Sequence, residues 1–185
     1  MRDSSAKHGR WRPGPGRELF DAARRELGDA ALVAEDLGVI TPAVVRLRAQ
    51  LGLPGMVVLQ WAFGARRGNP HALANHEEQS VVYTSTHDTD TVRGWFESLS
   101  KRQRNTTELD PRDPSWSTIE LAHSSRAALS IVPAQDLLGL GSDARLNRPG
   151  TATGNWRWRL RRGQLTDDLA ARLRESTARG VRLTT

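Results

Sequence analysis

Apolar positions along the chain recur with two different periods, one typical of helices and one typical of buried strands. Leu19, Phe20, Ala23 and Leu27 recur at helical spacing, so we expect a helix over residues 17–27. The same spacing predicts helices over residues 42–51, 90–99, 115–129 and 167–178. Short apolar runs bounded by turn residues predict four strands, over residues 31–34, 56–63, 80–86 and 130–138.

Strands that alternate with helices predict an α/β fold with a parallel sheet and right-handed crossovers. In such sheets the functional groups gather at the carboxyl ends of the strands. Glu35 follows the first predicted strand, His87 and Asp88 follow the third, and Asp136 lies in the fourth. Because side chains alternate along a strand, only one of Glu35 and Asp36 can face a given site.

The composition is that of a globular protein of ordinary size. The chain has 185 residues, of which 37% are hydrophobic and 26% charged, and it has no cysteine. The lack of cysteine excludes disulfides, thiolate metal sites and a cysteine nucleophile. No apolar run reaches the length of a membrane span, and the amino end is polar, so we expect a soluble, cytoplasmic protein. Residues 1–16 read as a loop or frayed end, and residues 17–185 as one domain.

The positive charge comes almost entirely from arginine, because only Lys7 and Lys101 are lysines. Most of the arginines are spread along the chain, and the net charge is +6. A local cluster comprises Trp156, Arg157, Trp158, Arg159, Arg161 and Arg162. This cluster leaves open a non-enzymatic basic module that binds nucleic acid, although a solvated or carboxylate-paired segment explains it as well.

Two further motifs point to bound groups, and both have plainer explanations. Residues 139–144 match the G-x-G-x-x-A pattern of dinucleotide sites, but no acidic residue lies about 20 positions further on. We therefore expect a turn and no organic cofactor. His87, Asp88 and Asp90, with His71 and His76 upstream, offer metal ligands in no diagnostic spacing. The alternative is that His71 and His76 are loop residues in solvent, and we expect no metal.

Paired carboxylates on neighbouring strands are a third possibility. Glu35 and Asp88 would suit glycoside chemistry, in which one carboxyl group works as acid and base at an oxocarbenium-like transition state. The spacing alone does not decide this, because each acid could instead cap a helix or pair with arginine.

Several sequence strings, taken together and in order, resemble the carboxyl-terminal part of the 4-alpha-glucanotransferases, the amylomaltase or disproportionating-enzyme family, glycoside hydrolase family 77. The strings are AEDLGVITP at 34–42, LPGM at 53–56, VVYTSTHDTDT at 81–91, QDLLGLG at 135–141, NRPGT at 147–151 and GNWRWR at 154–159. The resemblance implies part of a (β/α)8 TIM barrel, namely its carboxyl-terminal half with about four parallel strands. It also implies transfer of alpha-1,4-glucan segments with retention of configuration and without a cofactor.

The resemblance also implies roles for individual residues. Glu35 would be the general acid/base, Asp88 the carboxylate that stabilises the transition state, and His87 a hydrogen-bonding partner of the sugar. The retaining mechanism needs a carboxylate nucleophile about 5 to 5.5 Å from the acid/base. In the family that aspartate lies on an earlier strand, for which this sequence has no counterpart. We therefore expect the chain to need the amino-terminal half of the barrel as a partner and to be inactive alone.

Further glucan contacts are expected from aromatic and amide side chains. Trp faces stack on sugar rings, although Trp is also a common core residue. We take Trp61 as a glucan contact, with Gln60 and Asn155 as polar contacts beside His87. The remaining tryptophans of this group are Trp95, Trp156 and Trp158, of which the last two are expected to be mainly structural.

Overall fold

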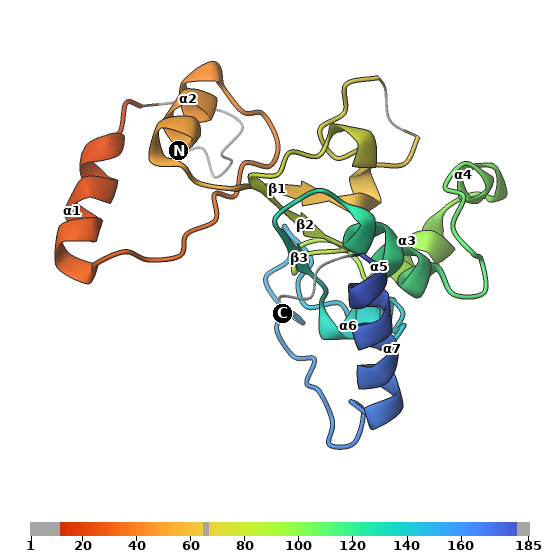
Figure 1. Cartoon of the computed structure of the whole chain (residues 1–185). Helices are drawn as coiled ribbons and strands as arrows, with labels where there is room; N and C mark the ends of the chain where they lie inside the picture. The colour runs from red at the N-terminus through yellow and green to blue at the C-terminus, as the bar shows by residue number, and fades with distance from the viewer. Residues whose placement is uncertain (1–11, 65–66, 181–185) are drawn as a thin grey trace, which may run out of the picture. The chain divides into compact units, whose positions relative to one another are not determined.

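The structure is a computed structural model that describes residues 12–64 and 67–180 (Figure 1). The chain forms two compact units, Met1–Pro54 and Gly55–Thr185, which are described here one at a time. Of the loop predicted over residues 1–16, residues 1–11 lie outside the described part, and residues 12–15 have no regular secondary structure.

The first unit holds two helices, α1 (Arg17–Leu27) and α2 (Pro42–Leu51), and both confirm the helical spacing. Proline stands at the first helical position of α2, and the hydroxyl of Thr41 accepts the Val44 N–H at 3.4 Å. The helix ends at Gly52, whose φ of 66° is left-handed and therefore favours glycine.

The strand predicted over residues 31–34 is wrong, because these residues have no regular secondary structure. Leu32 and Val33 are 45% and 41% exposed rather than buried. The Ala34 N–H donates to the Pro54 carbonyl at 2.9 Å, but the described part of this unit contains no strand with which the segment could pair. An apolar run becomes a strand only where a neighbouring strand takes up its backbone hydrogen bonds.

The second unit contains a parallel sheet of three strands in the order β1 (Gly55–Val58), β2 (Ser80–Tyr83) and β3 (Leu129–Ile131). The α/β class and the parallel sheet are therefore confirmed. The predicted count of four strands is not, since the described residues form three. The strand predicted over residues 130–138 stops at Ile131, and the helix α6 (Ala134–Leu137) follows. Pro133 has no N–H to donate to a ladder, so it ends the strand and precedes the helix.

Helices pack against this sheet and against one another. A core cluster joins Val57 of β1 and Val82 of β2 to Ala122 of α5 (Pro114–Ser124). The helix α7 (Asp167–Arg179) lies beside α5 (Figure 1), and the Nδ1 atom of His123 is 2.8 Å from the Ser176 hydroxyl. The predicted helix over residues 115–129 ends at Ser124, and β3 begins five residues later.

Two short helices complete the second unit, α3 (Val92–Ser98) and α4 (Lys101–Asn105). The first confirms the helix expected over residues 90–99. The segment between β2 and α3, residues 84–91, carries His87 and Asp88. Within the described ranges, no helix combines the length and the apolar character that crossing a membrane would require.

Candidate functional site

Two of the residues expected to act on the sugar, His87 and Asp88, lie on the segment that follows β2. The side chains of His87 and Asp88 are 46% and 47% exposed, so both are open to a ligand. The segment ends where Thr91 caps α3 by accepting the Gly94 N–H at 3.1 Å. The pair is therefore presented between a strand end and a helix start, as is usual for functional groups in parallel α/β folds.

Hydrogen bonds hold one side of Asp88 and leave the other side open. Its Oδ1 atom accepts the Asn147 side-chain N–H at 2.6 Å and lies 3.3 Å from the Nε2 atom of His87. Its backbone carbonyl accepts a 2.6 Å hydrogen bond from Arg145. No hydrogen bond to Oδ2 is recorded among the described residues. One carboxylate oxygen is thus fixed by the protein, while the other is available to a ligand.

An open aromatic surface lies next to Asp88. The rings of His87 and Trp156 are 5.3 Å apart between centroids, with an interplanar angle of 31°. Trp156 has a left-handed φ of 60°, and its N–H donates to the Leu146 carbonyl at 2.7 Å. The residue is 54% exposed, so part of its ring is open to a ligand, and the mainly structural role expected from the sequence stays a prediction. Exposed aromatic rings beside a carboxylate offer a flat face and a hydrogen-bond acceptor to the same ligand.

Asp90 is the structural anchor of the same segment. Its Oδ2 atom accepts the Ser142 hydroxyl at 2.7 Å and lies 4.0 Å from Arg145. Its backbone carbonyl accepts the side-chain amide of Gln60 at 2.7 Å. Sequence reasoning missed these contributions of Arg145 and Ser142, because neither stands out by type or spacing.

The other residues predicted to contact the glucan differ in their exposure and in the hydrogen bonds that they make within the protein. Gln60 is 6% exposed, and its amide is used by the bond to Asp90. Asn155 closes its own loop by accepting the Arg148 N–H at 3.0 Å and by donating to the Thr151 carbonyl at 3.1 Å. Trp61, in the short 3-10 helix η2 (Leu59–Trp61), is 41% exposed. Glucan contact by these three residues stays a prediction, and Trp61 is the most accessible.

Glu35 belongs to the first unit and is exposed, with no recorded partner among the described residues. Its neighbour Asp36 is instead paired with Arg48, at 3.2 Å between the charged atoms. Of the two adjacent acids, Asp36 is thus held by the protein, whereas the side chain of Glu35 is exposed. Because Glu35 and Asp88 lie in different units, their pairing stays a prediction.

His71 and His76, upstream of the segment, are not loop residues exposed to solvent. His76 is 2% exposed, and its ring nitrogens lie 2.7 Å from the Ser125 hydroxyl and 2.9 Å from the His71 carbonyl. His71 is half-buried and accepts the Val58 N–H at 3.1 Å. The solvent interpretation is therefore wrong, because burial and hydrogen bonding use these rings inside the fold. In the described ranges, no three His, Cys, Asp or Glu side chains converge as a metal site would require.

The G-x-G-x-x-A segment has the structure of a turn. Residues 142–144 form only the short 3-10 helix η4 (Ser142–Ala144), and Gly139 has a left-handed φ of 61°. The Gly139 carbonyl accepts the Arg93 side chain at 2.6 Å, which ties the turn to α3. A dinucleotide site needs a full helix whose free N-terminus faces the phosphates, so the turn interpretation is confirmed.

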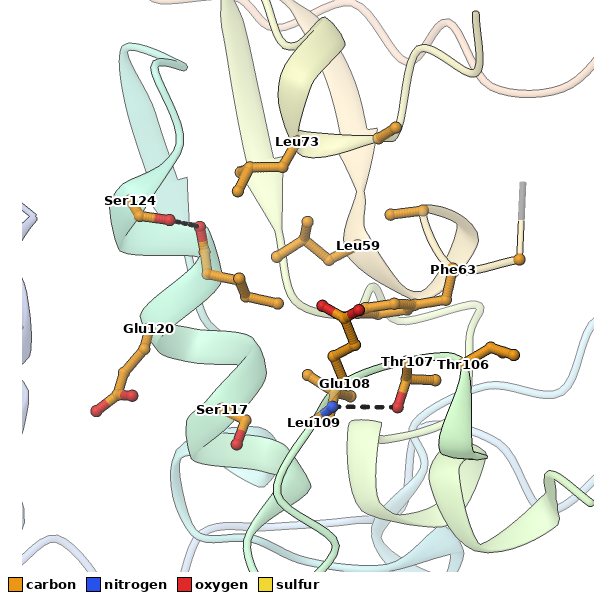
Figure 2. A pocket seen from close by; sticks show the side chains of 14 residues that line it. Leu59, Phe63, Leu73, Thr106, Thr107, Glu108, Leu109, Ser117, Glu120 and Ser124 are labelled. Carbon is orange, nitrogen blue, oxygen red and sulfur yellow. Dashed lines mark hydrogen bonds between the residues drawn. The ribbon is translucent and has the colours of Figure 1, made fainter. Parts of the chain in front are cut away.

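A cavity of about 780 Å³ in the second unit is lined in part by Leu59 of η2 (Figure 2). Leu59, Phe63 and Glu108 point into it, and the Phe63 ring stacks on Trp95 at 5.5 Å between centroids. The Ser124 hydroxyl donates to a backbone carbonyl at the rim. The residues that line this cavity include neither His87 nor Asp88, so it is separate from the carboxylate site.

Comparison with known proteins identifies a family. The family model described as 4-alpha-glucanotransferase, glycoside hydrolase family 77, matches residues 2–166. A chloroplastic/amyloplastic 4-alpha-glucanotransferase of Arabidopsis thaliana is 50% identical over 166 residues, which cover 87% of this chain and 29% of the relative. A 4-alpha-glucanotransferase of Synechocystis is 49% identical over 178 residues, covering 92% of this chain and 35% of the relative.

A solved structure supports the same assignment. The amylomaltase from Streptococcus agalactiae, in complex with acarbose, matches with a TM-score of 0.85 and 35% identity over 95% of this chain and 37% of that protein. The chain therefore spans about a third of the length of the relatives that it matches. The nucleic-acid interpretation of the arginine cluster finds no support in these comparisons, and Arg159 donates to the backbone carbonyls of Trp156 and Trp158.

Proposed function

Because the chain belongs to the 4-alpha-glucanotransferase family, glycoside hydrolase family 77, we propose that it forms the carboxyl-terminal part of a glucanotransferase (β/α)8 barrel. The parallel order of β1, β2 and β3 supports this, because a barrel of this kind is built from consecutive parallel strands. The open edges of the three-stranded sheet would then pair with strands contributed by the rest of the enzyme.

The reaction is the transfer of an alpha-1,4-glucan segment to an acceptor glucan or glucose. In the first step a carboxylate nucleophile outside this chain attacks the anomeric carbon, while Glu35 donates its proton to the leaving glycosidic oxygen. In the second step the acceptor hydroxyl attacks the same carbon, displaces the carboxylate that was bound in the first step, and gives its proton to Glu35, so the acid is restored. Two displacements at one carbon retain its configuration.

Asp88 and His87 act on the sugar during both steps. Positive charge develops on the sugar ring in the oxocarbenium-like transition state, and a fixed carboxylate beside it lowers the barrier. The observation that carries the proposal is the state of Asp88, whose Oδ1 is held by Asn147 at 2.6 Å while Oδ2 has no recorded partner in the described ranges. The adjacent ring of Trp156 supplies a stacking surface.

Disproportionation of maltotriose tests this function. We expect no glucose release by the chain alone, because the nucleophile comes from outside it. Joining the chain to the amino-terminal part of the Synechocystis relative, in place of the matching 35% of that enzyme, is expected to give an active chimera. Glu35→Gln in the chimera is expected to abolish transfer, whereas Glu26→Gln, an exposed acid of the same unit, leaves it intact.

Three results would contradict the proposal. The first is glucose release by the isolated chain that is lost in Glu35→Gln, since this would show a complete site within the chain. The second is a folded chimera that stays inactive with the unaltered sequence. The third is a chimera that keeps its activity after Glu35→Gln.

A further inference from the structure

Asp136 is a fully buried acid beneath the segment that carries His87 and Asp88, and its side chain has no exposed surface. We propose that Asp136 is a positioning residue, which fastens both ends of residues 84–92 and thereby sets the placement of Asp88 for catalysis. The proposal rests on the proposed function for its catalytic part, although the fastening itself does not depend on it.

The geometry of the carboxylate carries the inference. The Oδ2 atom of Asp136 accepts the Thr84 hydroxyl at 2.6 Å and the Ser85 hydroxyl at 2.5 Å. Its Oδ1 atom accepts the Val92 backbone N–H at 2.7 Å. Thr84 and Ser85 precede Asp88, and Val92 follows it at the start of α3. A single side chain therefore connects the beginning of the segment to its end.

The partners of Asp136 are as buried as the acid itself. Asp136, Thr84 and Val92 are each 0% exposed, and Ser85 is 3% exposed. Removing the carboxylate therefore takes the protein acceptor away from three buried donors, which is unfavourable at such a depth. The segment between the two fastened ends carries Asp88, which is about half exposed and is also held by Asn147 and Arg145.

Burying a carboxylate lowers the stability of a fold unless the lost hydration of the charged group is compensated. Burial raises the pKa of the Asp136 carboxyl above its ordinary value, while hydrogen bonds from Ser85, Thr84 and Val92 act in the opposite direction. The nearby carboxylate of Asp90 also raises this pKa. An apolar residue of similar size would avoid the desolvation but could not hold the three donors, which is consistent with a role in positioning.

Hydrogen bonds also fix the backbone around Asp136. It lies in α6, which begins directly after Pro133, and its N–H donates to the Pro133 carbonyl at 3.0 Å. The neighbouring Gln135 donates its side-chain amide to the Ala144 carbonyl at 3.3 Å, and its backbone carbonyl accepts the Leu140 N–H at 2.9 Å. A short helix tied on both sides gives the carboxylate a fixed position from which to hold the segment.

Hydrogen exchange of the whole chain tests the fastening without any need for activity. Asp136→Ala removes all three acceptors, and we expect amide exchange in residues 84–92 to accelerate about tenfold or more. Asp136→Asn retains a carbonyl oxygen for Val92 and an amide that can donate to the two hydroxyls, so a smaller increase is expected. Val57→Ala, which removes core packing in β1, serves as the control for general destabilisation.

Kinetics of the chimera tests the catalytic part. With transfer to maltotriose as the assay, Asp136→Ala is expected to lower kcat about 100-fold and to leave KM within about threefold, because misplacing a reacting group by about 1 Å has an effect of this size. Asp136→Asn is expected to recover part of the loss. Val57→Ala is expected to change the melting temperature but not kcat, provided that the assay is run well below melting.

The outcomes separate the two claims. Exchange in residues 84–92 that stays unchanged, or that rises equally in β1, would overturn the fastening. Local exchange that rises while kcat falls no further than in Val57→Ala would overturn the catalytic role of Asp136. A folded but inactive chimera with the unaltered sequence would count against the proposed function, and the exchange experiment would still decide the fastening.

Discussion

Asp88 and Asn147 are 59 positions apart in the chain, yet their side chains meet through a 2.6 Å hydrogen bond. The bond fixes one oxygen of a half-exposed carboxylate and so determines which oxygen faces a ligand. Arg145, two residues earlier, holds the Asp88 backbone carbonyl from the same side. The segment that follows η4 thus acts as a support for the residues that follow β2.

Asp88→Asn is expected to lower kcat of the chimera about 100- to 1,000-fold, because a neutral amide cannot stabilise positive charge on the sugar ring. Since Asp88 is half exposed, the free energy of unfolding is expected to change by less than about 1 kcal/mol. Steady-state transfer kinetics and urea denaturation measure the two effects. Asp143→Asn, an exposed acid of η4, is the matched control, and equal kinetics in the two variants would rule out the role given to Asp88.

Trp156→Ala is expected to raise KM for maltotriose about 2- to 10-fold with a smaller change in kcat, because it removes an exposed stacking surface beside His87. Initial-rate measurements over a range of maltotriose concentrations test this. Trp116→Phe provides a control, because Trp116 is buried in α5 beneath the Arg172 guanidinium, 4.0 Å from the ring centroid. An unchanged KM in Trp156→Ala would assign the ring to loop structure alone.

Gly94→Ala is expected to destabilise the second unit by about 1 to 3 kcal/mol. A Cβ atom at this position would lie 2.8 Å from the Ser142 backbone nitrogen and 2.9 Å from Oδ1 of Asp90, so the helix α3 would have to move away from η4. Thermal denaturation measures the change. Gly14→Ala is the control, since a Cβ there meets no atom within 4 Å, and equal melting temperatures would show that α3 shifts without strain.

The raised pKa of Asp136 predicts a pH dependence of stability. Between its ordinary value of 3.8 and the higher value in the folded state, the folded chain binds more protons than the unfolded chain. The stability contributed by Asp136 is therefore fully present below pH 3.8 and decreases as the pH rises through the folded-state pKa. Asp136→Asn removes this dependence.

Urea denaturation at pH 4 and pH 7 tests the sign. The free energy of unfolding of the unaltered chain minus that of Asp136→Asn is expected to be larger at pH 4 than at pH 7. Comparing the two chains at each pH cancels the titration of the other acids. A difference that stays constant, or that grows toward pH 7, would show that the folded-state pKa of Asp136 is not raised.

Local sequence determined much of this protein. Helical spacing located α1, α2, α3 and α7, because the period of apolar positions is set by helix geometry and needs no knowledge of distant residues. Pro and Gly also predicted where helices begin and end, because their effect on the backbone is local, as at Pro42 and Gly52. The order of short motifs identified the family, which the comparisons confirm.

Tertiary structure alone decided the rest, because strand formation and side-chain partners depend on residues far apart in the chain. Residues 31–34 have the apolar run of a strand but pair with no strand in the described part of the first unit, and the run over residues 130–138 divides at Pro133 into a strand and a helix. No periodicity shows that Asn147 reaches Asp88, or that Asp136 holds Thr84 and Val92 from more than 40 positions away. Such contacts arise only when the sheet and its connections bring the segments together.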